Sequence, residues 1–177
     1  MGPMRDPNTT VNTIFDEHLA VAQACRQSLT GPVVELATAL IAAYAADGRL
    51  LVFGNGGSAG DAQHLAGELT GHYRRDRRPL SALALTTDTS VLTATANDYA
   101  YEDVFARQVE AHGRALDVVV GISTSGNAEN VIRGVLAGRA CGATTWALTG
   151  AAGGRLASAA DHALQVPSDD TARIQEM

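Results

Sequence analysis

Lysine is absent from this 177-residue sequence, and all 13 basic residues are arginine. Without lysine the chain cannot form a Schiff base with a sugar, anchor pyridoxal phosphate or hold a nucleotide through a P-loop lysine. Cysteine is also scarce. Cys25 and Cys141 lie far apart in helix-like apolar stretches, which favours two reduced core thiols over a disulfide or a metal site.

Charged residues make up only 18% of the chain, and the net charge is −6. An acidic balance argues against a nucleic-acid or anionic-membrane partner, because binding to phosphate backbones needs a basic face. The one basic run, RRDRR at 74–78, is expected where a helix ends, since arginine is favourable at the negative end of the helix dipole. No apolar run is long enough to span a membrane and MGPMRDPN has no signal-peptide pattern, so we expect a cytoplasmic protein.

The spacing of apolar residues predicts the α/β class. Helical spacing over 9–46, broken at Gly31–Pro32, predicts two helices. After residue 48, short apolar runs alternate with helical patterns, which is typical of a parallel sheet covered on both faces. The expected strands are 49–54, 81–85, 117–122, 144–148 and 162–166, and the expected helices are 59–73, 88–96, 101–111, 128–141 and 153–159. We therefore expect residues 1–46 as a helical extension and 47–177 as a three-layer, flavodoxin-like domain.

Two loops of similar composition come after the first and third expected strands. The first reads GNGGS (54–58) and the second STSGN (123–127), each leading into a helix. In the strand order 2-1-3-4-5, strands one and three flank the topological switch point, where ligands bind beyond the carboxyl ends. Both loops are then predicted to open onto one crevice.

The second loop has the composition of a phosphate cradle. Helix capping by Ser58 and by Ser125 or Asn127 would account for one such residue per loop. Three hydroxyls, backbone N–H groups and a helix start occur together at 123–127, and this combination favours an anion site. The first loop also matches G-x-G-x-x-A. A dinucleotide site has an acidic residue at the end of the second strand about 20 positions farther on, whereas here the second expected strand ends later, at Thr86-Thr87-Asp88. We expect a small phosphate ester and no nucleotide cofactor.

Polar residues recur along one face of the helix after the first loop. His64, Glu68 and His72 are spaced at i, i+4 steps, with Asp61 one turn earlier. This pattern fits a solvated helix face, half of a metal site or a general base beside a sugar, and spacing alone leaves the three open. The cluster Asn97-Asp98-Tyr99 is expected in a turn.

Five segments then carry a resemblance to a known family. In order they are GNGGSAGDAQHLAGELTGHY, TANDYAYEDVFARQVEAHGR, GISTSGNAENV, TGAAGG and TARIQE. Together they resemble the sugar isomerase (SIS) domain family, and within it the phosphoheptose isomerases. The resemblance covers nearly the whole chain. It implies an aldose–ketose isomerase that acts on sedoheptulose 7-phosphate, in a homotetramer held together by the N-terminal helices.

The resemblance also implies roles for individual residues. Glu68 would be the base that moves a proton between C1 and C2, and one zinc ion per subunit would be bound by His64, Glu68 and Gln175. The residues implied to bind substrate are Asn55, Gly56, Gly57, Ser58, Glu68, Asn97, Asp98, Ser123, Thr124, Ser125, Asn127 and Gln175.

Two departures and two alternatives accompany this interpretation. The family pattern continues past position 177 into a long helix with a further histidine, so we expect a C-terminal helix cut short. Ala128 replaces an expected serine.

One alternative function is a non-enzymatic binding protein that resembles the DnaA initiator-associating protein. The other is a module that senses a sugar phosphate.

Overall fold

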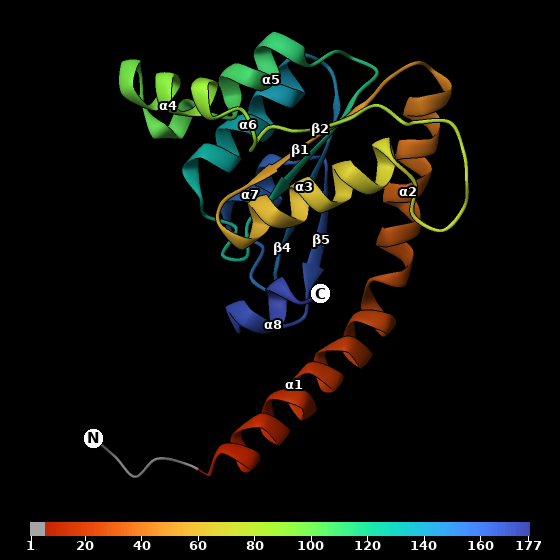
Figure 1. Ribbon diagram of the computed structural model, residues 1–177, viewed down its shortest axis with the longest axis vertical. Coiled ribbons are helices and arrows are strands. Elements are labelled where there is room, and N and C mark those ends of the chain that lie inside the picture. Colours follow the sequence, from red (N-terminus) through yellow and green to blue (C-terminus); the bar gives the residue numbers. More distant parts are fainter. Residues whose placement is uncertain (1–5) are drawn as a thin grey trace.

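The computed structural model describes residues 6–177, which form five parallel strands between two layers of helices (Figure 1). The strand order β2-β1-β3-β4-β5 is the predicted one. The strands are β1 (Leu50–Gly54), β2 (Ala82–Ala84), β3 (Val118–Ile122), β4 (Thr144–Gly150) and β5 (His162–Val166). The helices are α1 (Pro7–Ser28), α2 (Thr30–Ala45), α3 (Gly57–Thr70), α4 (Thr89–Asp98), the 3-10 turn η1 (Tyr101–Asp103), α5 (Ala106–His112), α6 (Glu129–Ala140), α7 (Gly154–Ala159) and α8 (Thr171–Gln175).

Alternate residues of the central strands form two separate cores. Leu51 and Phe53 point to the face covered by α5, α6 and α7, where Phe53 stacks on Phe105 with ring centroids 4.9 Å apart. Leu50 and Val52 point to the opposite face, which α2 and α3 cover. Because side chains alternate along a strand, continuous apolar strands require a helical layer on each side. The prediction of a parallel sheet covered by helices on both faces is confirmed.

The break between the N-terminal helices lies at Leu29, two residues before the predicted Gly31–Pro32. Pro32 falls in the first turn of α2, where backbone N–H groups have no partner within the helix, so its missing donor costs nothing there. The two helices meet at 64°, and α1 projects from the body as an arm (Figure 1). No single helix within residues 6–177 has the length and apolar character to cross a membrane, although the bent pair α1–α2 passes that test by length and composition.

Helix α3 is shorter than predicted, since it ends at Thr70 rather than 73. His72 therefore lies outside the helix and does not continue the line of His64 and Glu68. The basic run lies in the next loop, where Arg77 donates hydrogen bonds to the carbonyl oxygens of Glu68 (2.7 Å) and Leu69 (2.8 Å). Of the basic run, the guanidinium of Arg77 thus makes the expected contact with the C-terminus of α3. The two cysteines are free, as predicted, but both are half-buried rather than enclosed in the core.

Candidate active site

The first loop turns sharply between β1 and α3. Gly56 adopts φ +55°, a conformation that favours glycine. At Gly54 the chain passes so close to its neighbours that an added Cβ would lie 2.7 Å from the Ser58 Cβ and 2.8 Å from the Ile122 carbonyl oxygen. The glycines therefore let α3 begin directly against the ends of β1 and β3, which fixes the direction of its polar face.

The second loop is a compact turn supported by the segment 150–156. The Gly126 N–H donates to the Ser123 carbonyl (2.9 Å), while the Gly126 and Thr124 carbonyls accept from the N–H groups of Leu156 (2.8 Å) and Gly150 (3.0 Å). Gly126 has φ +66° and packs against the backbone at Gly153. The TGAAGG segment thus holds the second loop in place.

Side-chain capping does not account for the polar residues of the loops, which corrects the capping interpretation. Gly56 is the N-cap of α3 and Ala128 that of α6, and neither helix has a side-chain capping bond at that residue. The hydroxyl oxygens of Ser123 and Ser125 lie 3.5 Å apart, and Ser125 Oγ accepts from the Asn127 N–H at 3.2 Å. Two hydroxyls therefore converge just before the positive end of α6, an arrangement suited to an anion.

The start of α6 carries a balanced set of charges. Glu129 pairs with Arg155 (2.7 Å) and Arg133 (3.2 Å), and Arg133 also reaches Asp103 (2.7 Å). Hydrogen bonds from Arg155 and then Arg133 hold the pKa of Glu129 below its usual value. The carboxylate beside the second loop is therefore ionised but compensated by two guanidinium groups, which reduces its repulsion of an anion.

A cleft of about 730 Å³ lies between α2, α3 and α8, and more than half of its lining residues are apolar. Its lining includes His64, Glu68, Gln175 and, at the second loop, Thr124. The His64 Nε2 and Glu68 Oε1 atoms are 3.3 Å apart. The structure thus brings together the predicted base, the predicted metal ligands and one residue of the predicted phosphate loop.

Asp61 and Gln175 close one side of this cleft. Ser58 Oγ donates to Gln175 Oε1 (3.2 Å), and the Gln175 amide donates to Asp61. Burial raises the pKa of Asp61, and the contacts with Gln175 and His64 offset this only in part. Gln175 therefore joins the C-terminal helix to the first turns of α3.

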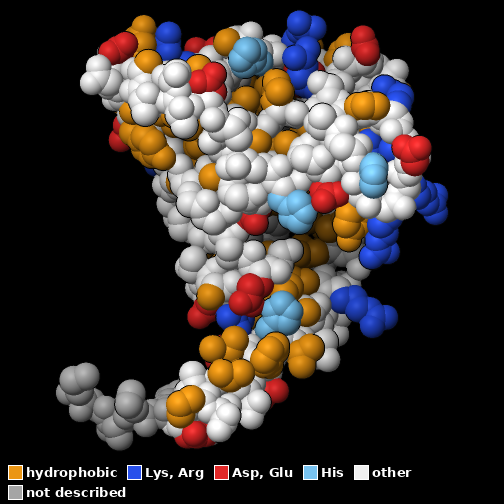
Figure 2. Space-filling model, viewed as in Figure 1, with side chains coloured by type: hydrophobic (Ala, Val, Ile, Leu, Met, Phe, Trp, Pro, Cys, Tyr) orange, Lys and Arg blue, Asp and Glu red, His pale blue; other side chains and the backbone are white. Residues whose placement is uncertain are grey.

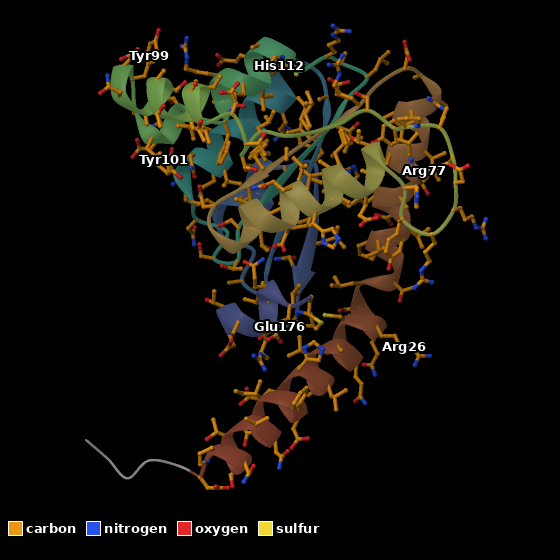
Figure 3. All side chains as sticks on the ribbon, viewed as in Figure 1. Arg26, Arg77, Tyr99, Tyr101, His112 and Glu176 are labelled. Atoms are coloured by element: carbon orange, nitrogen blue, oxygen red, sulfur yellow. The ribbon has the colours of Figure 1, made fainter. Side chains whose placement is uncertain are left out.

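Helix α8 is itself anchored to the arm, as Figure 3 shows near Glu176. The buried Arg173 guanidinium donates to the Ile14 carbonyl (2.7 Å) and to Glu176 (2.9 Å), and His18 pairs with Glu176 at 2.9 Å. The position of Gln175 thus depends on α1, an element from the opposite end of the sequence.

Of the predicted site residues, only His64, Glu68, Thr124 and Gln175 line the cleft. The other predicted residues of the two loops do not: Asn55, Gly56, Gly57, Ser58, Ser123, Ser125 and Asn127. Asn97 and Asp98 form the last turn of α4 instead of a loop, bonded to each other at 2.7 Å, and neither lines the cleft. Three residues farther on, the Tyr101 hydroxyl donates to Asn55 (3.1 Å). Sequence reasoning missed Tyr101 and Asn130, because an asparagine inside a first helical turn and an exposed tyrosine carry no local signal of a long-range contact.

Comparison with known proteins identifies the family. A model of the SIS domain matches residues 14–150, and the chain belongs to that family. Relatives within it bear the name phosphoheptose isomerase. That of Aquifex aeolicus is 50% identical over 166 residues, which cover 94% of this chain and 87% of the relative. A probable phosphoheptose isomerase of Thermoplasma acidophilum is 54% identical over 145 residues, or 82% of this chain and 80% of the relative.

Solved structures agree with this assignment. The phosphoheptose isomerase of Neisseria gonorrhoeae is 46% identical, with a TM-score of 0.91 over 97% of this chain and 91% of its own. That of Francisella tularensis is 34% identical, with a TM-score of 0.94 over 97% and 92%. The resemblance inferred from the sequence motifs is therefore confirmed, and so is the fold.

Proposed function

We propose that this chain is a phosphoheptose isomerase, which converts sedoheptulose 7-phosphate to D-glycero-D-manno-heptose 7-phosphate in the biosynthesis of nucleotide-activated heptose. The observation that carries the proposal is a single cleft lined by Thr124 of the second loop and by His64 and Glu68 of α3. Relatives about half identical to this chain bear the name of that enzyme. The expected cytoplasmic location stays a prediction.

The second loop is proposed to bind the phosphate. The support is the pair of converging hydroxyls of Ser123 and Ser125 next to the start of α6. Within residues 6–177, no protein acceptor takes the backbone N–H groups of Thr124 and Ser125, so both are available to phosphate oxygens. Asn127 closes the turn and is proposed to complete the cradle.

Glu68 is proposed as the base of the isomerisation. Its carboxylate removes a proton from C1 of the ketose to form an enediolate and returns it to C2, while a hydroxyl proton passes from O1 to O2. Such a transfer needs a carboxylate within hydrogen-bond reach of both carbons. The residues 55–58 and Gln175 are proposed to hold the sugar hydroxyls, with Asn97 and Asp98 as further contacts.

Zinc is proposed as the cofactor, with His64, Glu68 and Gln175 as ligands. The 3.3 Å between His64 Nε2 and Glu68 Oε1 is roughly the edge of a tetrahedron with bonds of about 2.0–2.1 Å to the metal. Gln175 lies beside the same helix face and offers a carboxamide oxygen. No cluster of three His, Cys, Asp or Glu residues occurs within the described chain, so Gln175 is needed as the third donor. A bound zinc ion would act as a Lewis acid on the substrate oxygens.

Metal analysis of purified protein tests the zinc proposal. We expect about one zinc per chain, lost on His64→Ala and kept on His112→Ala, which removes an imidazole from the distant α5. Full activity of metal-free protein, or zinc retained by His64→Ala, contradicts the proposal.

A homotetramer is proposed from the exposed apolar face of the arm. Val11, Ile14, Phe15 and Leu19 are all exposed, and Figure 2 shows apolar side chains gathered along this helix. An apolar patch of this kind is typical of a protein–protein contact. Light scattering should give four chains per particle, and a Phe15→Asp variant should dissociate.

Glu68→Gln tests the isomerase mechanism. The amide keeps the size of the side chain but accepts no proton, so we expect turnover of sedoheptulose 7-phosphate to fall by about 10²–10⁴-fold. Glu110→Gln, an exposed change on α5, is the control and should leave turnover unchanged. Wild-type activity in Glu68→Gln would reject Glu68 as the base. Binding of the substrate by wild-type protein without turnover would favour the sensing module.

A further inference from the structure

A reciprocal pair of amide hydrogen bonds joins the two sides of the crevice. Asn55 Nδ2 donates to Asn130 Oδ1, and Asn130 Nδ2 donates to Asn55 Oδ1, both at 2.9 Å. Asn55 comes directly after β1, whereas Asn130 is the second residue of α6 and is buried. The pair therefore bridges the first loop and the helix that begins after the second loop.

Further hydrogen bonds fix the orientation of both amides. Asn130 Oδ1 also accepts from the Val131 N–H (2.9 Å), and Asn55 Oδ1 accepts from the Tyr101 hydroxyl (3.1 Å). Each carbonyl oxygen thus receives two donors, its full capacity. A flipped amide would oppose donor to donor and acceptor to acceptor, so the pair has one stable arrangement.

We propose that Asn130 is a positioning residue that, through Asn55, sets the distance between the second loop, which binds the phosphate, and the first loop, which holds the sugar. This inference rests on the proposed function. A phosphate held at 123–125 anchors one end of the substrate, and the carbon chain must then reach Glu68 on α3. Because Asn55 precedes the first residue of α3 by only two positions, its tie to α6 aligns α3 with the anchored phosphate.

A purely structural role for Asn130 predicts a different outcome. If the residue only stabilised the start of α6, its loss would weaken binding of any phosphate compound equally. If it aligns the two loops, binding of inorganic phosphate, which needs only the second loop, is unaffected. The affinity for the whole sugar phosphate then falls, because alignment matters only to a ligand that spans both loops.

The test compares Asn130→Ser with wild type in the full chain. Serine is neutral and retains an oxygen for the Val131 N–H, but it is too short to pair with Asn55. With two neutral hydrogen bonds lost, we expect KM for sedoheptulose 7-phosphate to rise about tenfold and the inhibition constant of inorganic phosphate to change less than twofold. Glu110→Gln, an exposed change on α5, is the control and should alter neither.

Each other result has a defined meaning. An unchanged KM, or a rise in KM matched by the phosphate inhibition constant, overturns the proposal. If wild type shows no turnover, the proposed function fails, and calorimetric affinities for the sugar phosphate and for phosphate make the same comparison. If Asn130→Ser does not fold, Tyr101→Phe decides. It removes only the hydroxyl bond to Asn55 and should raise KM about threefold, and no rise overturns the proposal.

Discussion

Replacing Gly126 by alanine is expected to destabilise the protein strongly. Gly126 has φ +66°, and an added Cβ would overlap the carbonyl oxygen of Gly153 and lie 2.6 Å from its carbonyl carbon. Neither backbone can move away freely, because the Gly126 carbonyl accepts the Leu156 N–H at 2.8 Å. The substitution therefore forces the second loop and the turn at 150–154 apart.

The cost has two parts. A left-handed conformation costs an alanine about 1–2 kcal/mol, and crowding within a packed region adds about 1–3 kcal/mol. The free energy of unfolding should therefore fall by about 2–5 kcal/mol. For a chain of this size each kcal/mol lowers the melting temperature by about 2–4 °C, so we expect a decrease of about 4–20 °C.

Thermal unfolding measured by circular dichroism detects this decrease. The control is Gly31→Ala in the first turn of α2, where an added Cβ meets nothing within 4 Å and the melting temperature should stay the same or rise slightly. Because the loop must shift, the affinity of Gly126→Ala for inorganic phosphate should also fall. A melting temperature within 2 °C of wild type, together with wild-type phosphate affinity, would refute the close-packing argument.

Two further predictions concern stability. Arg77→Met removes the hydrogen bonds that end α3, so the free energy of unfolding should fall by about 1–3 kcal/mol, with faster amide exchange in the last turn of α3. Exposed Arg75→Met is the control, and equal effects of the two would contradict the capping role. Burial raises the pKa of Asp161, but hydrogen bonds from Thr145 and the charge of Arg139 outweigh it, and the net pKa is lowered. The resulting stabilisation is complete above the unfolded-state pKa of about 3.9 and is lost as the pH falls through the lower folded-state pKa. In urea unfolding, the difference in free energy of unfolding between wild type and Asp161→Asn should therefore shrink below about pH 4. A difference that stays constant down to pH 2 would contradict the lowered pKa of Asp161.

The strands β1 and β3 and the two loops could be predicted because their signals are local. Apolar runs bounded by glycine or serine identify β1 and β3, and the composition of 54–58 and 123–127 identifies the polar loop at the end of each strand. The helix ends were less accurate. The loss of His72 from α3 and the shift of the break to Leu29 both depend on which backbone groups find partners, and periodicity does not contain that information.

The sequence by itself determined the class of the protein, because alternation, turn residues and glycine positions act over a few residues and do not depend on the rest of the chain. Only the tertiary structure decided which polar groups meet. Asn55 and Asn130 are 75 residues apart and Gln175 is 114 residues from Asp61. Such contacts arise from the register of parallel strands and the packing of α8 on α1, where small displacements determine whether two groups form a hydrogen bond.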